Sequence, residues 1–351
     1  MTRAWFCSLL LLACQPGEHA RQAPPDDEPT MPTPPATPEP RFDLADLECE
    51  QWACTWLVRV EADGRPSRAL STAPSRLGRL AVDDECLVWS ESISFSIVRR
   101  ARLDTLEVFG PDLGAGSAKH PEDLLVVGGR IFAADELGVH EWQAERRWRT
   151  IAGGDSLALA IVDEGLIRTR RPGGPTGVIE RWPLAGGDSR VLAADEHRPG
   201  DLAASELGLV WLDAGQDQPG RVRLQRPDGR VRTIADAEQG PLRVAAGASV
   251  IAWIDRGPDA RVVRAWADDR IETLASMPDA RWRQGSRESV ALRGDTVLWS
   301  RSDAVVSGTI GGASREEIVL PSNASLIDFA LAGDALILAI EFAGPEPIRP
   351  D

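Results

Sequence analysis

Five acidic residues recur shortly after the second of two apolar segments in successive repeats, and their type and spacing could do chemistry. They are Glu91, Asp135, Asp213, Asp255 and Asp303. Carboxylates that converge on one face of a ring would form an acidic site able to receive a basic partner or a divalent cation such as calcium. The structural alternative is that each residue only starts a turn by bonding its own backbone.

Two histidines stand in matching contexts before apolar segments. His120 is followed by Pro-Glu-Asp-Leu, and His197 is followed by Arg-Pro-Gly-Asp-Leu. If the two segments are equivalent strands, both imidazoles lie on the same face as the acidic residues. The simpler interpretation is a solvated loop in which proline fixes the entry to the strand.

The elements that must position these residues come from a repeat of roughly 40 residues, the period of propeller blades. Each copy has an apolar strand, a tight turn with Gly or Asp, and a second apolar strand that often ends in Trp. The copies are 80–89, 124–133, 159–168, 202–211, 244–253, 290–299 and 329–339. Trp89, Trp211, Trp253 and Trp299 share one position, which predicts packing between blades rather than a surface for stacking a ligand.

A second, more polar hairpin follows most copies, as at 178–192 and 221–234. The exceptions lie at the two ends: a hairpin at 56–71 has no apolar partner before it, and the last apolar hairpin, 326–340, has no polar hairpin after it. Joining them in one composite blade leaves no long strand edge exposed. We therefore predict an all-β fold, a seven-bladed β-propeller of four-stranded antiparallel blades closed by a composite blade of both termini.

The sequence pattern of the repeats resembles that of the TolB-like and YWTD-like propellers of bacterial secreted proteins. The Val-Trp strand ends and the segment Pro183-Leu184-Ala185-Gly186-Gly187 carry this resemblance, which covers about residues 56–340. The resemblance implies the fold and no active site. The Tyr-Trp-Thr-Asp tetrad is missing from a chain without tyrosine, so a receptor function is not implied.

The N-terminus reads as an export signal. Arg3 precedes a short apolar run that ends at Cys14, too short to span a bilayer as a helix. The run Leu11-Leu12-Ala13-Cys14 resembles the bacterial lipobox, which implies cleavage before Cys14 and lipidation of its thiol. Lipoproteins that are retained in the inner membrane have Asp directly after the lipidated Cys. This chain has Gln15 there, so the resemblance implies the outer membrane. The alternatives are an ordinary signal peptide with a chance cysteine, or Cys7, which bulky Phe6 disfavours as the lipidated residue.

The predicted domains follow from these boundaries. Residues 1–13 form the signal peptide, 14–41 the lipidated cysteine and a proline-rich tether, 42–345 the propeller, and 346–351 a tail. The tether has too little apolar surface to fold, so we expect it to remain extended and solvated.

Three further cysteines remain beyond the lipobox. Cys49 and Cys54 are close enough in sequence to form a local disulfide bond. The alternative is a bond between Cys54 and Cys86 that staples the composite blade to its neighbour; otherwise Cys86 is a small buried hydrophobic residue. These spacings are not those of a zinc site.

Composition narrows the partners. The chain has 351 residues and a formal charge of −15, which argues against a nucleic-acid partner because phosphate backbones require clustered Lys and Arg. We expect a monomer whose ligand is an unidentified protein or small molecule, with the membrane reached through the lipid anchor and no resident cofactor.

No catalytic constellation emerges from the sequence. A Gly-x-Ser-x-Gly elbow and a phosphate-binding loop are absent, and Asn323 is the single asparagine, which weakens the case for a calcium-dependent lactonase. The first hypothesis is therefore a non-catalytic, lipid-anchored binding or scaffolding propeller at the cell envelope. The alternative is a propeller hydrolase or lactonase with an acidic metal site at the central channel.

Overall fold

The computed structural model describes 43–44, 47, 53–72, 76–92, 96–109, 121–143, 147–171, 176–197, 199–213, 219–237, 240–278 and 288–343. These residues belong to the compact unit Pro40–Asp351, whereas the unit Met1–Glu39 lies outside the described residues. The predicted signal peptide, Cys14, the tether, Cys49, His120 and the tail also lie outside them. Within the described part of the chain, no helix is long and apolar enough to cross a membrane.

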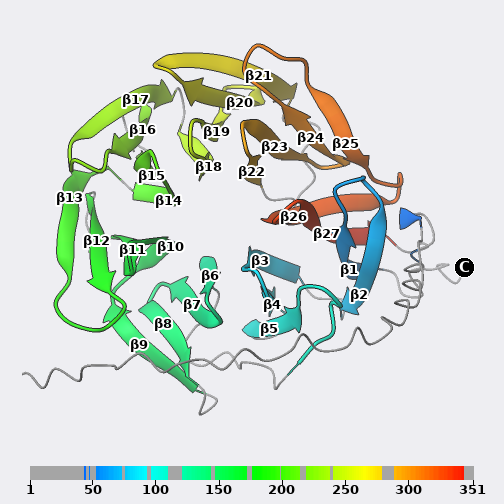
Figure 1. Ribbon diagram of the computed structural model, residues 1–351, viewed down its shortest axis with the longest axis horizontal. Coiled ribbons are helices and arrows are strands. Elements are labelled where there is room, and N and C mark those ends of the chain that lie inside the picture. The colour runs from blue at the N-terminus through cyan, green and yellow to red at the C-terminus, as the bar shows by residue number, and fades with distance from the viewer. Residues whose placement is uncertain are drawn as a thin grey trace, which may run out of the picture. The chain divides into compact units, whose positions relative to one another are not determined.

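Seven antiparallel sheets are arranged around a central axis, as Figure 1 shows, so the predicted seven-bladed propeller is confirmed. In each blade the first strand lies innermost. The first blade comprises β3 (Arg76–Val82), β4 (Cys86–Ser92) and β5 (Ser96–Arg102). The second comprises β6 (Asp123–Val127), β7 (Arg130–Asp135), β8 (Gly138–Gln143) and β9 (Arg147–Gly153). The third comprises β10 (Ser156–Val162), β11 (Gly165–Arg170), β12 (Gly177–Pro183) and β13 (Arg190–Glu196).

The remaining blades follow the same order from the axis outward. The fourth comprises β14 (Pro199–Ser205), β15 (Gly208–Asp213), β16 (Gly220–Gln225) and β17 (Val231–Ala237). The fifth comprises β18 (Pro241–Ala246), β19 (Ile251–Arg256), β20 (Ala260–Ala267) and β21 (Arg270–Pro278). The sixth comprises β22 (Val290–Arg293), β23 (Thr296–Arg301), β24 (Ala304–Gly308) and β25 (Arg315–Val319). The seventh comprises β26 (Ala324–Ala332), β27 (Ala335–Ala343), β1 (Ala53–Val60) and β2 (Pro66–Thr72).

The seventh blade joins the two ends of the folded unit, which confirms the predicted closure. Its strand order is β2-β1-β27-β26, and Trp56 pairs with Ile340 across the antiparallel β1–β27 ladder. Leu57 and Val58 are fully buried there. Strand β1 therefore supplies both backbone hydrogen bonds and core side chains to the C-terminal hairpin.

Among the described residues the first blade has three strands, in contrast to the four of every other sheet. After β5 the described chain turns back and forms one isolated antiparallel bridge, between Ala101 and Val108. Leu106 enables this tight return with a positive φ of 54°, a conformation that few residues other than glycine adopt.

The hydrophobic core is divided among the seven contacts between adjacent blades. The four repeated tryptophans are buried to within 1% exposure, and each packs on the blade before it. Trp253, for example, packs with Val210 and Leu212 of the fourth blade. The predicted role of these tryptophans in packing between blades is confirmed.

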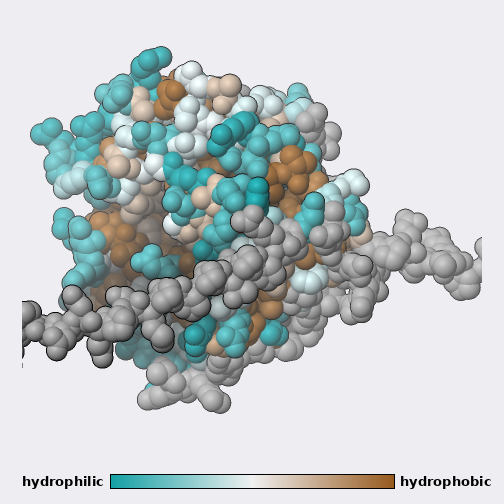
Figure 2. Space-filling model, turned by 45° about the vertical axis from the view of Figure 1, so that its right-hand side comes forward, coloured by the Kyte–Doolittle hydropathy of each residue, from teal (hydrophilic) through white to brown (hydrophobic). Residues whose placement is uncertain are grey.

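The outer strands are more polar than the inner ones because one of their edges faces solvent. In β9, an outermost strand, four of the seven residues are exposed, whereas in β10, an innermost strand, no residue is exposed. Figure 2 shows hydrophilic side chains over much of one face, with smaller apolar areas between them.

Candidate functional site

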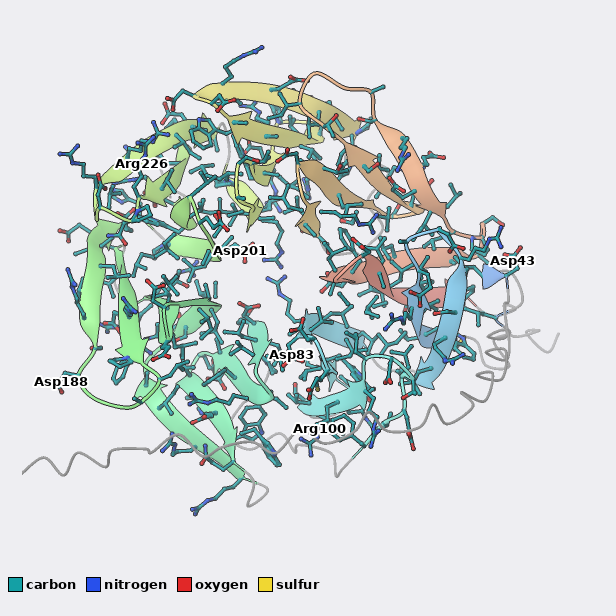
Figure 3. All side chains as sticks on the ribbon, viewed as in Figure 1. Asp43, Asp83, Arg100, Asp188, Asp201 and Arg226 are labelled. Carbon is teal, nitrogen blue, oxygen red and sulfur yellow. The ribbon has the colours of Figure 1, made fainter. Side chains whose placement is uncertain are left out.

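One position on the innermost strand of each blade, or directly before it in the sixth blade, lies toward the central axis, and we call these seven residues the axial ring. Each stands directly before the first apolar residue of the repeat, such as Leu80 or Leu159. The axial ring consists of Arg79, Asp123, Ala158, Asp201, Arg243, Ser289 and Asp328. Figure 3 shows Asp201 near the axis, while Asp188 and Arg226 lie at the outer rim.

The three aspartates of the axial ring bind the backbone of the next blade. Asp123 Oδ2 accepts a hydrogen bond from the N–H of Leu159 at 2.8 Å. Asp201 Oδ2 accepts one from the N–H of Val244 at 2.9 Å. Asp328 Oδ2 accepts one from the N–H of Leu80 at 3.3 Å, across the closure of the ring. Each carboxylate therefore fixes the spacing of two adjacent blades.

The two arginines of the axial ring make the complementary link. Arg79 Nε donates to the carbonyl oxygen of Glu122 at 3.2 Å, and Arg243 Nε donates to that of Glu288 at 2.9 Å. The backbone of each next blade thus presents a carbonyl group just before its axial residue and an N–H just after it. An axial arginine donates to that carbonyl group, and an axial aspartate accepts from that N–H.

The two remaining axial residues differ from this scheme. Ser289 Oγ donates to Asp328 Oδ1, which links the sixth blade to the seventh. Ala158 has no polar side chain, and its own N–H donates to Thr169 Oγ1 within the third blade at 3.1 Å. In the described residues, the contact between the third and fourth blades is the one without an axial side-chain hydrogen bond.

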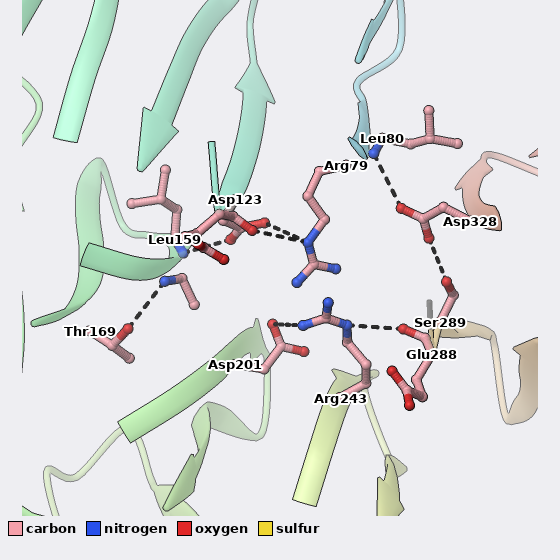
Figure 4. Close-up of polar contacts among 12 residues, drawn as sticks. Arg79, Leu80, Asp123, Leu159, Thr169, Asp201, Arg243, Glu288, Ser289 and Asp328 are labelled. Atoms are coloured by element: carbon pink, nitrogen blue, oxygen red, sulfur yellow. Dashed lines mark hydrogen bonds and ion pairs between the residues drawn. The ribbon is translucent and has the colours of Figure 1, made fainter. Parts of the chain in front are cut away.

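The axial ring is a coupled set of charges. Arg79 lies 3.9 Å from Asp123, and Arg243 lies 3.7 Å from Asp201 (Figure 4). Burial raises the pKa of Asp123 to about 6, Arg79 opposes this shift, and the charge of Asp201 adds to it. Burial acts to lower the pKa of Arg79, but Asp123, Asp201 and Asp328 outweigh it and raise that pKa.

Four of the five acidic residues predicted for the ligand face are the last or last but one residue of the second strand of their blades, and they are buried. Glu91 accepts a hydrogen bond from Trp89 Nε1 at 2.8 Å and forms an ion pair with Arg99 at 3.0 Å. Asp255 forms an ion pair with Arg264 at 3.3 Å. These carboxylates therefore pair within their own blades.

Asp303 is not equivalent to the other four acidic residues, so its predicted membership of the ring is wrong. It lies in the exposed turn after β23 and forms an ion pair with Arg301, which occupies the position equivalent to Asp213. The sixth blade therefore has the opposite charge at the shared position.

Asp135 pairs with a histidine that sequence reasoning did not single out. His140 Nε2 and Asp135 Oδ1 are 3.0 Å apart, His140 Nδ1 and Thr150 Oγ1 are 3.0 Å apart, and both His140 and Asp135 are fully buried. Burial acts to raise the pKa of Asp135, but hydrogen bonds from His140 and two backbone N–H groups lower it. Four consecutive residues of β8, Gly138 to Glu141, are buried, so no alternation along this strand marks His140 in the sequence.

The charge of His197 acts on Asp213, so two of the predicted residues interact electrostatically. Burial raises the pKa of Asp213 to about 6, the nearby Glu196 adds to the shift, and His197 opposes it. Asp213 Oδ1 is buried without a hydrogen-bond partner. Glu196 itself accepts a hydrogen bond from Trp211 Nε1 at 3.1 Å. Among the described residues, no group of three or more His, Cys, Asp or Glu could hold a metal ion.

The cysteines are divided between a disulfide bond and a free thiol. Cys54 is disulfide-bonded, whereas Cys86 is buried and free, so the alternative bond between Cys54 and Cys86 is wrong. Pairing of Cys54 with Cys49 stays a prediction because Cys49 lies outside the described residues. Cys86 packs between the first and second blades, as expected for a small hydrophobic residue.

A surface cavity of about 330 Å³ lies between the second and third blades. Its polar lining includes Glu141, whose two oxygens each lie 2.6 Å from an arginine, Arg130 and Arg149. Hydrogen bonds from these arginines outweigh burial and lower the pKa of Glu141. Because the cavity's charged groups already pair with one another, the axial ring is the stronger candidate site.

Comparisons with known proteins agree on the fold. No family model matches the sequence, and no curated protein matches it. The WD40 domain of Neurospora crassa Pan2 superposes with a TM-score of 0.55 at 10% identity, covering 78% of this chain and 90% of that one.

Two other solved structures are similar in the same way. Virginiamycin B lyase from Staphylococcus aureus has a TM-score of 0.53 at 10% identity and covers 81% of this chain and 99% of that one. The WD40 domain of Toxoplasma gondii coronin has a TM-score of 0.52 at 13% identity and covers 85% and 87%. At these identities the likeness is one of fold, and the chain is a β-propeller.

Proposed function

We propose that this protein is a non-catalytic binding or scaffolding propeller, anchored to the outer membrane through a lipid on Cys14. The observation that carries the proposal is the gathering of charged side chains from five blades on one axis. Arg79, Asp123, Asp201, Arg243 and Asp328 each link their blade to the next. A ring fixed in this way presents its faces as a rigid surface to a protein or small-molecule partner.

The location rests on the N-terminal sequence. Arg3, the apolar run and Leu11-Leu12-Ala13-Cys14 have the order of a lipoprotein signal. Two or three acyl chains hold a protein firmly at a membrane where one does not. The proline-rich segment that follows would let the ring reach partners away from the bilayer.

Fractionation of cells tests the anchor. Cys14→Ser should move the protein from the membrane pellet to the soluble fraction, while Cys86→Ser, which removes a thiol inside the ring, should leave it in the pellet. If Cys14→Ser stays in the pellet after salt and carbonate washes, the lipid anchor is refuted. Crosslinking in intact cells, followed by capture of the tagged mature protein, then tests for a partner.

A second candidate, a hydrolase with an acidic metal site, has one observation in its favour, although no three described His, Cys, Asp or Glu side chains are arranged to hold a metal ion. Asp213 has a buried carboxylate oxygen without a hydrogen-bond partner beside Glu196 and near His197. Calcium bound there would raise the melting temperature by binding only the folded state, and Asp213→Asn should abolish that rise. Calorimetric titration with calcium that shows no heat at millimolar concentration counts against this candidate.

A further inference from the structure

Two arginines of the axial ring point toward one another across the central axis. Figure 4 shows the guanidinium groups of Arg79, from the first blade, and Arg243, from the fifth, with their terminal nitrogens facing the same space. Their side chains are only 12% and 20% exposed. Two cations are therefore held in a confined position by opposite sides of the propeller.

Linking the blades does not require arginine at these positions. Leu80, Leu159 and Val244 pair with Trp89, Arg168 and Trp253, and their N–H groups bind an axial aspartate of the preceding blade. Leu124 and Val290 occupy the same register, paired with Ala133 and Trp299. Their N–H groups therefore point toward the preceding blade as well, where an aspartate could accept from them.

What arginine adds at positions 79 and 243 is a set of donors that the blades do not use. In the described part of the chain, each of these guanidiniums makes one hydrogen bond, and it comes from Nε. Asp201 Oδ1 lies 3.7 Å from Arg243 Nη1, beyond hydrogen-bond distance. The terminal nitrogens of both arginines are consequently open to a ligand.

The two cations also repel one another. Burial lowers the pKa of Arg243, and the charge of Arg79 is the next cause of that shift. An anion between the two guanidiniums would remove this repulsion and accept hydrogen bonds from both sides. Arginine binds planar carboxylates and phosphates through two parallel N–H groups, so oxyanions suit this geometry.

We propose that Arg79 and Arg243 form a clamp for the oxyanion group, carboxylate or phosphate, of a ligand that enters along the propeller axis. This inference deepens the proposed binding function and rests on it. Three aspartates surround the two arginines, so the axial ring is formally negative by one charge. This charge disfavours polyanions, and we therefore expect a ligand with a single oxyanion group.

Binding of simple anions to the mature protein tests the clamp. The melting temperature is measured in sodium acetate and in sodium sulfate, with sodium chloride at equal ionic strength as the reference, and affinity is measured by calorimetry. Acetate represents a carboxylate, and sulfate represents a tetrahedral group such as phosphate. We expect at least one of the two to raise the melting temperature, with saturation at millimolar concentration.

The variants Arg79→Gln and Arg243→Gln should each weaken that affinity by about tenfold, since one charge-assisted interaction is lost. Arg230→Gln is the matched control, because Arg230 carries the same charge in an exposed turn and should leave binding unchanged. If Arg243→Gln does not fold, Arg243→Asp takes its place. Asp at this position can accept from the N–H of Val290 and cannot bind an anion.

The outcomes separate the clamp from the proposed function. No stabilisation by either anion, or equal stabilisation of the parent and both arginine variants, overturns the clamp. If the parent and both arginine variants capture the same partner equally well, the binding function is supported and the clamp takes no part in binding that partner. Anion binding that depends on both arginines supports the clamp, whatever the partner.

Discussion

Asp201 in the fourth blade accepts a hydrogen bond from the backbone N–H of Val244 in the fifth, at 2.9 Å. The bond joins two strands that no sheet ladder connects. It belongs to a series in which axial side chains link six of the seven pairs of adjacent blades. Backbone hydrogen bonds hold each blade together, and these side chains add polar links to the hydrophobic packing between the blades.

Removing that link should destabilise the ring. Asp201→Ala leaves the N–H of Val244 without its acceptor, so we expect the free energy of unfolding to fall by about 1–3 kcal/mol. Asp201→Asn keeps an acceptor oxygen and should cost less than half as much. Urea unfolding measures both variants, and equal stability of Asp201→Ala and the parent would show that the link contributes nothing.

Mild acid should stabilise the protein. Asp123 and Asp213 have folded-state pKa values of about 6, raised from 3.8, so the folded protein binds their protons more tightly than the unfolded chain does. Their ionisation costs stability above pH 6, and this cost is relieved as the pH falls. Between pH 7 and pH 5.5 each contributes about 1 kcal/mol, or on the order of 2–4 °C in Tm.

Carboxylates whose pKa is lowered by folding have the opposite effect on stability: their protonation destabilises the folded protein, and it occurs at lower pH. Glu141 and Glu180 contribute stability that is lost only as the pH falls below their ordinary value of 4.5. Thermal melts across the pH range should therefore show a maximum between these two regimes. Asp123→Asn and Asp213→Asn should each flatten the rise between pH 7 and pH 5.5; an unchanged rise in the double variant would assign it to other groups.

Closure of the ring should depend on its N-terminal hairpin. Deletion of residues 42–72 removes β1 and β2, exposes the edge of β27, and takes the buried side chains of Leu57 and Val58 from two blade contacts. We expect Tm to fall by more than 10 °C, since even one buried leucine truncated to alanine costs about 2–5 kcal/mol. Deletion of residues 15–41 is the matched control and should leave Tm unchanged. Equal melting of both deletions would contradict closure.

Cys86 should be chemically protected in the folded protein. Burial raises the pKa of its thiol to about 11, and the side chain packs between two blades. At pH 8 its thiolate fraction is therefore about 0.1%, and the reactive sulfur is shielded from solvent. Alkylation with iodoacetamide, followed by peptide mapping, should modify Cys86 in urea and leave it largely intact without denaturant. Rapid labelling of the folded protein would disprove this.

The fold could be predicted because its signal is repeated. Alternating apolar segments ended by Trp89, Trp211, Trp253 and Trp299 mark the inner hairpins, and the unmatched hairpins at the two ends require one another. The three described strands of the first blade could not be predicted in this way, since in the described residues the return after Ala101 is a single backbone bridge to Val108.

The axial ring escaped sequence reasoning because its members share a position without sharing a chemistry. Arg79 binds a backbone carbonyl group of the next blade, Asp123 binds a backbone N–H, and Ser289 binds the side chain of Asp328, so no single residue type marks the position. Strand register alone makes them equivalent. The acidic residues were easier to notice because their charge repeats, yet burial directs Glu91 and Asp255 to partners within their blades.

The composite blade also makes the protein suitable for circular permutation, because it brings the first and last strands of the chain together in one sheet. Ala53 and Ala343 are partners in the β1–β27 ladder, so the first residue of β1 and the last residue of β27 lie opposite one another. A short peptide could join them covalently, and new termini could be opened in an exposed turn such as that at Gly186-Gly187. The same seven blades would then follow one another from a different starting blade, and the N-terminal segment would join the ring at a different place.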